Sequence, residues 1–459
     1  MLDKKEQKLD KKEQKLIKHV FEDGDSLFSL LSTVRSRRIG YGYRYDTGKP
    51  EVHPVTGRTL HAPEGPLQFE SKKEPLPLTE LEEALLCWAA CGPNGIVTAD
   101  ITPNFGQNTM ISYAGRTAPA PCNDLAVELF VINDSGTYIY RPGEERSKII
   151  EIEGEEDYYK ILQWYRDGLI KVSDKRPDFD WAIMAPGTLA SPWQYNWNRP
   201  GTTLFIPVYD IAKECINALM CFMEFSGFMI VDDDTGEPAG MGDWAEPGKL
   251  EIPVTQKTLE ELLLHADDFQ AGAVMQNMRL AAEAMGLGCW IFGGTSEDLV
   301  LGGVPNESKG LGFLYESFKG GNFYMGIPGL LEGFGLPAPW WKNSDEVVDE
   351  VIARKYRRGS FYAKEDNWMK RCGGPFKPEV MPTIVDHPKM QIPDWVQDAT
   401  KSYLRYMVDK YGHFPVHFSP YHMHIQIQIH HADAEFYDKY YAEGYITDKI
   451  RNHLDRWHK

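Results

Sequence analysis

Hydrophobic residues along the chain recur at helical spacing in some segments and at strand spacing in others. Apolar positions three or four residues apart predict helices over residues 17–34, 78–90, 211–225, 259–285, 345–356 and 395–411. The longest of these helices is followed by Gly286, a residue type that commonly ends helices. A last helix, rich in aromatic and charged residues, is predicted over residues 436–457.

Runs of β-branched and aromatic residues predict strands between these helices. Residues 125–132 and 138–140 are such runs, and the sequence Asn133-Asp134-Ser135-Gly136 between them predicts a hairpin. Residues 422–430 alternate strictly, with apolar side chains on one face and histidines and glutamines on the other, and we expect solvent or a partner subunit to cover the polar face. Further strands are predicted over residues 202–208, 228–231 and 289–292. Helices and strands mix without a regular βαβ order, so the predicted fold class is α+β.

The N-terminus contains a short repeat. The seven residues Leu-Asp-Lys-Lys-Glu-Gln-Lys occur at 2–8 and again at 9–15. One apolar residue per heptad over so short a stretch is too little for a stable coiled coil. Residues 1–16 are therefore predicted to form a charged, solvated helical extension.

Length and charge limit the possible function classes. The chain has 459 residues, enough for about three domains or for one elaborated domain. Its 49 lysines and arginines against 67 aspartates and glutamates give a net charge of −18, which disfavours nucleic acid and anionic membranes as partners. The first residues form no apolar signal segment, and the longest apolar stretch, 216–231, is interrupted by Asn217 and Glu224. We therefore expect a soluble, cytoplasmic protein whose seven cysteines, none in CxxC spacing, are reduced.

Three separated segments are candidates for chemistry, because the common nucleotide-binding and hydrolase motifs are absent from the sequence. The first is Arg35-Ser36-Arg37-Arg38, where guanidinium groups and a hydroxyl suit an anionic ligand such as phosphate. The alternative is a solvated basic patch paired with nearby acids.

The second and third segments suit a flat ligand. Residues 115–123 combine small residues and prolines in a stiff turn, and Asn123 offers a donor and an acceptor to a heterocycle edge. Residues 276–290 form a helix with a small-residue face that ends in Gly286-Leu287-Gly288, and Gly293-Gly294 follow shortly after. An ordinary tight turn and plain helix packing are the respective alternatives.

In this order, the three segments resemble the nitroreductase-like flavoprotein superfamily, which carries an Arg-Ser-x-Arg element, a Pro-Ser-x-x-Asn turn and a helix exit of the Gly-Leu-Gly type. The hairpin that contains Gly136-Thr137-Tyr138-Ile139-Tyr140 is most similar to the branch that includes azoline (thiazoline and oxazoline) dehydrogenases. The resemblance extends over about residues 17–294, with residues 151–256 only loosely matched. It implies a nitroreductase-like α+β fold in which helices flank a central antiparallel-rich sheet, with insertions and a C-terminal extension.

The resemblance also implies an FMN site. Arg35, Ser36 and Arg38 would hold the phosphate of FMN. The isoalloxazine ring would be lined by four residues of the turn, Pro119, Ala120, Pro121 and Asn123, and walled by Gly286, Leu287, Gly288 and Gly293. Two departures affect the ring contacts: Ala120 stands where the family has Ser, and Leu125-Ala126-Val127 replaces the Gln-Pro-Trp that often follows Asn.

By the same resemblance, the flavin does the chemistry and no protein nucleophile is needed. The predicted activity is two-electron hydride transfer between FMN and a small organic substrate, with NAD(P)H as donor, in a homodimer. One alternative is a flavin dehydrogenase or oxidase that passes electrons to dioxygen, and another is a non-catalytic binding protein with a flavin fold. The predicted organisation is a helical extension (1–16), an FMN domain (17–300, insertion about 151–256) and a C-terminal extension (301–459) that wraps the core or the partner subunit.

Histidines near the C-terminus are the main candidates for a different kind of site, one that binds a metal ion. A metal could be held by His413 with His417, by His422 with His424, or by His430 and His431 with Asp433 and Glu435. None of these spacings is diagnostic of a metal site, and a polar strand face explains the alternation. The sequence therefore predicts no metal ligand.

Overall fold

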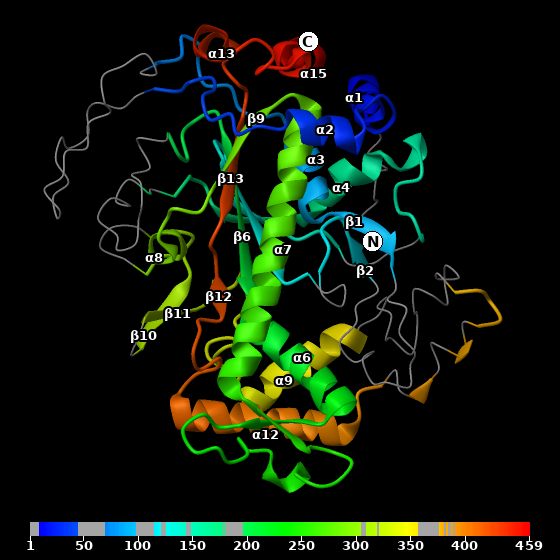
Figure 1. Ribbon diagram of the computed structural model, residues 1–459, viewed down its shortest axis with the longest axis vertical. Helices are drawn as coiled ribbons and strands as arrows, with labels where there is room; N and C mark the ends of the chain where they lie inside the picture. The colour runs from blue at the N-terminus through cyan, green and yellow to red at the C-terminus, as the bar shows by residue number, and fades with distance from the viewer. Residues whose placement is uncertain are drawn as a thin grey trace, which may run out of the picture.

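A computed structural model describes most of the chain. The described residues are 9–44, 69–97, 114–120, 125–143, 148–177, 179, 196–303, 309–318, 321–356, 376–380, 382–383, 387–388 and 391–459. Figure 1 shows a tall molecule in which one long helix, α7 (Gln256–Met285), runs beside a central sheet. The predicted α+β class is confirmed.

The central sheet is antiparallel throughout. Its strand order is β5-β4-β3-β6-β13-β9, and β12 (Tyr421–His422) also pairs with β6. The bounds are β3 (Val127–Asn133), β4 (Gly136–Tyr140), β5 (Leu169–Ser173), β6 (Thr203–Asp210), β9 (Gly288–Phe292) and β13 (Gln426–His430). The predicted hairpin is β3–β4, closed by Asp134 and Ser135. An inner strand, β13, comes from near the end of the chain and lies between β6 and β9.

Both faces of the sheet are covered, because alternate side chains of its strands enter two different cores. Leu129, Val131 and Ile427 pack on one face with α3 (Glu80–Cys91) and α7. Phe130, Ile206 and their same-face neighbours pack on the other side with α8 (Glu297–Leu301) and the hairpin β10 (Leu314–Phe318)–β11 (Gly321–Gly326).

A third core lies at the lower end of α7 in Figure 1. It is built by α6 (Ile211–Ser226), α9 (Ser344–Tyr356) and α12 (Asp394–Tyr411), which pack with α7 and the parallel pair β7 (Phe228–Val231)–β8 (Ile252–Thr255). Further elements are β1 (Pro93–Ile96), β2 (Ala114–Arg116), α4 (Tyr159–Gly168) and the 3-10 turns η4 (Glu155–Asp157) and η6 (Gly242–Trp244).

Two predicted helices are wrong in extent, because helix-breaking residues divide them. Residues 17–34 form two helices, α1 (Lys11–Glu22) and α2 (Leu27–Thr33), separated by Asp23-Gly24-Asp25 and a Ser26 cap. Residues 436–457 form three, α13 (Ala434–Tyr440), α14 (Asp448–Arg451) and α15 (His453–Trp457), and Gly444 has a φ of +84° in the gap between the first two.

The predicted strand over residues 422–430 is also interrupted, and most of its polar face is buried, with His424 as the exposed member. β12 and β13 are separate, and Met423 packs on the opposite side of the sheet from Ile427. Gln426, Gln428 and His430 are all buried, because β13 is an inner strand with helices and loops on both faces. Among the described helices, none is long and apolar enough to cross a membrane.

Candidate functional site

The predicted Gly-Leu-Gly exit lies where α7 meets the C-terminal part of the chain. Gly286 caps α7 with a φ of +83°, and a Cβ at this position would lie 2.5 Å from the Lys449 carbonyl oxygen. A Cβ at Gly288 would lie 3.0 Å from His430 Nε2 and from Ala432 Cβ. Leu287 between them is buried. Packing within the chain thus explains why small or apolar residues occupy these three positions, and none of the three faces open space.

The predicted phosphate segment lies directly beside this exit. The backbone N–H of Arg37 donates to the Cys289 carbonyl oxygen at 2.8 Å. The structure therefore brings the first and third predicted segments together, although they are far apart in the sequence.

The arginines of this segment have different surroundings. Arg37 is buried and pairs with Glu283 at 2.5 Å, and its guanidinium also donates to the carbonyl oxygens of Thr33 and Tyr445. Arg35 and Ser36 are exposed, and Arg38 is half-buried with its guanidinium over the Tyr43 ring. The segment therefore holds one structural arginine and presents a positive charge and a hydroxyl to solvent.

The second predicted segment contacts α7 farther from its end. The Asn277 side chain donates to the Thr117 carbonyl oxygen at 3.1 Å, about two and a half helical turns before Gly286. Pro119 is exposed and Ala120 is half-buried. Pro121 and Asn123 lie outside the described residues.

The last predicted wall residue is separated from the other glycines. Gly293 is exposed just beyond β9, at the opposite end of that strand from Gly288, which is about 17 Å away at the rise of an extended chain. The structure therefore gathers Arg35, Ser36, Arg38 and the Gly286 exit, but not Gly293.

Two of the candidate metal-binding histidines have other partners. His413 Nδ1 donates to the Pro415 carbonyl oxygen at 2.7 Å, and its ring packs on Phe318. His417 Nε2 lies 2.6 Å from the Asp233 carboxylate. These contacts give the two rings different hydrogen-bond partners.

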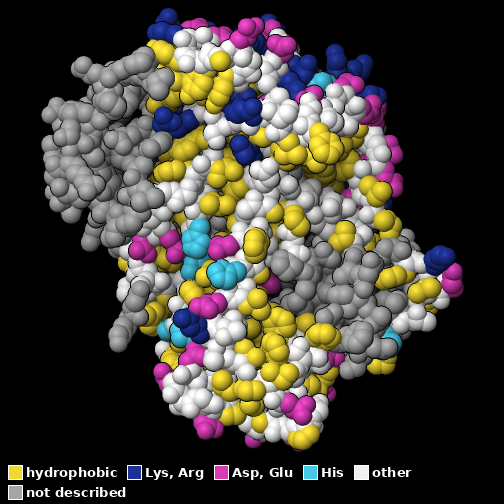
Figure 2. Space-filling view, viewed as in Figure 1, with side chains coloured by type: hydrophobic (Ala, Val, Ile, Leu, Met, Phe, Trp, Pro, Cys, Tyr) yellow, Lys and Arg dark blue, Asp and Glu magenta, His cyan; other side chains and the backbone are white. Residues whose placement is uncertain are grey.

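His422 and His424 do meet, together with acidic residues. Figure 2 shows histidine and acidic side chains gathered over β12 and the lower half of α7. His422 Nδ1 lies 3.1 Å from Glu297, and His424 Nδ1 lies 2.9 Å from Asp268. The hydrogen bond to Asp268 raises the pKa of His424. Each histidine thus has its own carboxylate, in a half-exposed cluster.

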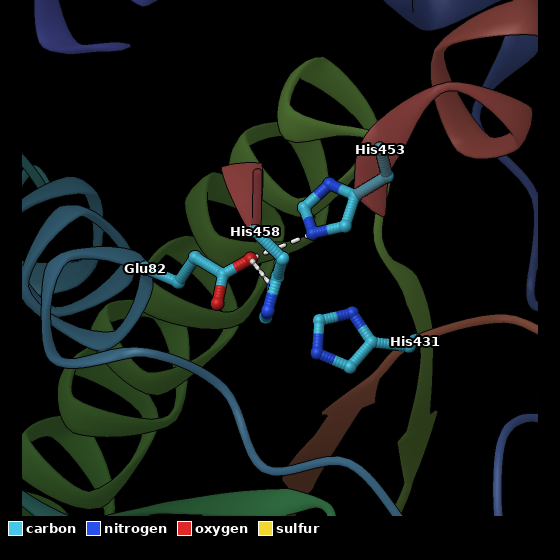
Figure 3. A group of neighbouring side chains, drawn as sticks. All are labelled: Glu82, His431, His453 and His458. Carbon is cyan, nitrogen blue, oxygen red and sulfur yellow. Dashed lines mark hydrogen bonds and ion pairs between the residues drawn. The ribbon is translucent and has the colours of Figure 1, made fainter. Parts of the chain in front are cut away.

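A second cluster is buried and contains residues that the sequence did not single out. Figure 3 shows Glu82, from the first turn of α3, facing His431, His453 and His458. One ligand atom from each side chain lies within 4.8 Å of the others. Glu82 Oε1 is 2.6 Å from His453 Nε2 and 3.4 Å from His458 Nε2. Because Glu82 Oε2 accepts from Thr79 at the helix cap, the carboxylate has a fixed orientation.

In this cluster the carboxylate is charged and at least one imidazole ring is neutral. Burial disfavours the charged form of Glu82, but hydrogen bonds from His453 and His458 outweigh it and lower the pKa of that carboxyl. Burial lowers the pKa of His431 to about 4, although the Glu82 charge opposes the shift. At neutral pH, Glu82 is therefore ionised and His431 is uncharged.

One signal in the sequence could have indicated this cluster. His453 and His458 are separated by four residues, within the spacing that zinc-binding histidine pairs often show. Glu82 carries no such signal, because its place in a helix N-terminus is explained by capping alone.

The structure also contains an open groove of about 880 Å³ between α1 and the C-terminal residues. Its lining includes Lys12, Lys15, Lys18, Arg456 and Lys459, and none of the predicted flavin residues is among the lining residues. The groove is therefore separate from the predicted flavin residues.

Comparisons with known proteins do not assign the chain to a family. No protein-family model matches the chain, and no curated protein does. Among solved structures, the chain is similar to a "putative nitroreductase" from Ralstonia eutropha JMP134, with 16% sequence identity, a TM-score of 0.23, and coverage of 61% of this chain and 74% of that chain. A similarity at this level carries no argument about function.

Proposed function

We propose that this protein is a nitroreductase-like, FMN-dependent oxidoreductase that transfers two electrons between the flavin and a small organic substrate, with NAD(P)H as donor. The proposal depends on the hydrogen bond from Arg37 to Cys289, which fixes Arg35 and Ser36 beside the end of α7. Two segments that the sequence resemblance links to one cofactor are thereby adjacent in space.

The residues beside the α7 exit fit a phosphate group. Arg35 is exposed and donates one N–H to the Val34 carbonyl oxygen, which leaves other donors of its five-donor guanidinium directed to solvent. Ser36 adds an exposed hydroxyl. Arg37 is excluded from this role, because Glu283 neutralises it in the core. A basic site in a chain of net charge −18 also selects an anionic ligand locally.

When bound, FMN would supply the redox chemistry itself. The chain would contribute the phosphate contacts of Arg35, Ser36 and Arg38 and a stiff wall at Pro119 and Ala120. Gly286, Leu287 and Gly288 are buried against the C-terminal part of the chain. They would therefore support the flavin-binding surface from its inner side.

A homodimer belongs to the same proposal. Exposed apolar side chains lie on α2, directly before the proposed phosphate segment, and on α7 and β9, and they are Leu27, Phe28, Leu31, Leu262, Phe269 and Ile291. Leu262 and Phe269 lie in the half of α7 that is far from Gly286. Figure 2 shows hydrophobic side chains along this face of the molecule. A second copy of the chain would bury them and enclose a flavin bound beside Arg35.

The second candidate is a dehydrogenase or oxidase that passes electrons to dioxygen. It is favoured by the β3–β4 hairpin, whose sequence is similar to the azoline dehydrogenase branch. Anaerobic bleaching of the flavin by NADH or NADPH supports the reductase. Bleaching by substrate alone, with oxygen consumed on reoxidation, supports the oxidase.

The flavin itself is tested by purification and by substitution. We expect the purified protein, or the protein reconstituted with FMN, to absorb in the yellow flavin bands and to release FMN on denaturation. Arg35→Ala with Arg38→Ala is expected to weaken FMN binding by more than about 100-fold, since each charge-assisted hydrogen bond contributes about 1.5–3 kcal/mol.

Arg405→Ala is the matched control, because Arg405 is an exposed arginine on α12, paired with Asp345 at the opposite end of α7 from the segment. A colourless protein that cannot be reconstituted would refute the flavin proposal. Full FMN retention in the double variant would refute the phosphate site.

A further inference from the structure

The ligand atoms of Glu82 and three histidines lie within 4.8 Å of one another in the buried cluster, and backbone contacts fix the tautomers of two of the rings. His453 Nδ1 lies 2.8 Å from the Met285 carbonyl oxygen. A carbonyl oxygen only accepts, so this nitrogen carries the hydrogen. In the neutral ring, the Nε2 lone pair then points at Glu82 Oε1 at 2.6 Å. Two lone pairs repel at that distance unless a proton or a cation lies between them.

His431 provides an independent observation. Its Nε2 lies 3.4 Å from the Pro77 carbonyl oxygen, which again assigns the hydrogen to that nitrogen. Its Nδ1 is buried and has no hydrogen-bond partner among the described residues. Only 3% of His431 is exposed, so water does not reach this atom from the surface. In Figure 3, the ring lies beside His453 and His458.

These contacts match the surroundings of metal-bound histidines. Such rings commonly donate their second N–H to a backbone carbonyl, which fixes the tautomer and aims the other nitrogen at the metal. His453 and His431 both have that arrangement, with Met285 and Pro77 as acceptors. Glu82 is oriented in turn by the Thr79 cap.

The spacing of the donors suits a small tetrahedral ion. Bond lengths of about 2.0–2.1 Å place tetrahedral zinc ligands about 3.3 Å apart. Glu82 Oε1 and His458 Nε2 are 3.4 Å apart, and the closer pair, Glu82 and His453, would open by about 0.7 Å around an ion. Imidazole and carboxylate ligands without cysteine suit Zn²⁺ and its first-row neighbours.

We propose that Glu82, His431, His453 and His458 bind one divalent transition metal ion, with Zn²⁺ as the best fit, in a closed structural site. The four ligands come from α3, from the residue after β13 and from both ends of α15. The ion would therefore fasten the C-terminal segment to α3. That segment also covers Gly286, through Lys449. The site does not depend on a bound flavin.

The full-length protein tests this proposal directly. After chelator treatment and dialysis, titration with Zn²⁺ is expected to show one ion bound per chain and to raise the midpoint of thermal unfolding. Co²⁺ is expected to bind with the intense visible absorbance of a tetrahedral site. His458→Ala should weaken Zn²⁺ binding about 100-fold or more, since even outer-shell changes cost metal sites 10–100-fold.

Matched variants distinguish a ligand from a merely structural residue. His458 is partly exposed, so its replacement by alanine leaves a folded chain that circular dichroism can verify. His458→Cys keeps a zinc ligand and should restore binding. His417→Ala removes a histidine that pairs with a carboxylate elsewhere and should change nothing.

Three results would overturn the proposal: no Zn²⁺ binding to the chelator-treated chain, an octahedral Co²⁺ spectrum, or binding lost in His424→Ala and kept in His458→Ala. The last result would move the ion to the half-exposed cluster of Glu297, His422 and His424. Flavin content, measured on the same samples, shows separately whether the flavin proposal fails.

Discussion

Arg35 and Arg37 are two residues apart, yet the fold gives them opposite surroundings. The Arg37 guanidinium is almost fully buried against Glu283, and its remaining donors meet two carbonyl oxygens. Arg35 is exposed to solvent. Spacing alone does not separate these roles, because a cluster of four polar residues at the end of a helix has no periodicity that indicates which side chain faces inward.

Removing Arg37 is expected to destabilise the protein. Arg37→Met leaves Glu283 buried without its partner, which costs about 3–5 kcal/mol in the free energy of unfolding. Denaturant titration measures the loss. Replacing both partners, as in Arg37→Met with Glu283→Leu, should recover most of it, because no charge is then left buried. Arg35→Met should leave stability unchanged, and an equal loss there would contradict the separation of roles.

At the scale of elements, one buried carboxylate makes most of the polar contacts that attach the loop after β7 to the end of α12. Asp232 is buried and accepts hydrogen bonds from Lys410 at 2.6 Å, Tyr411 at 2.7 Å and Tyr406 at 3.2 Å. Burial by itself favours the neutral acid, but these hydrogen bonds outweigh it and lower the pKa of Asp232. The loop carries no periodic pattern, so this attachment depends on the packing of the third core, around α6, α9 and α12.

A lowered pKa makes this contribution depend on pH. Asp232 stabilises the folded chain above the ordinary carboxyl pKa of about 3.9, and the contribution is lost as the pH falls through the folded value. We expect Asp232→Asn to cost about 2–4 kcal/mol at pH 7. The difference from the wild type should shrink below about pH 4. Unfolding curves recorded from pH 3 to pH 8 measure it, and a constant difference would contradict this account.

At the scale of the whole molecule, the exposed apolar side chains of α2 and α7 are the surface that the proposed homodimer would use. Phe28 is 83% exposed and Phe269 is 78% exposed, unusual values for large aromatic side chains on two elements that pack together. The proposed homodimer would bury them.

Light scattering after size exclusion tests the dimer. The wild type is expected at twice the 52.3 kDa of one chain. Phe28→Asp with Phe269→Asp should give a monomer with reduced FMN content, since a charge in an apolar interface is costly. Leu314→Asp, on β10, replaces another exposed apolar residue and should leave the mass unchanged. A monomeric wild type would refute the homodimer.

Local patterns in the sequence determined most of the elements. Helix α3 begins within two residues of its predicted start, the β3–β4 hairpin closes at its predicted turn, and α7 ends at Gly286. These features depend on contacts between near neighbours, such as capping, turn geometry and periodic apolar faces, which the sequence displays directly.

Only the tertiary structure decided which distant residues meet. It placed β13 inside the sheet, so that a strand face rich in histidine and glutamine is buried. It also brought Glu82 to His431, His453 and His458, and the Arg37 backbone to Cys289. The physical reason is that burial and long-range pairing depend on strand order and packing between segments far apart in the chain, and local hydrophobic periodicity carries no information about either.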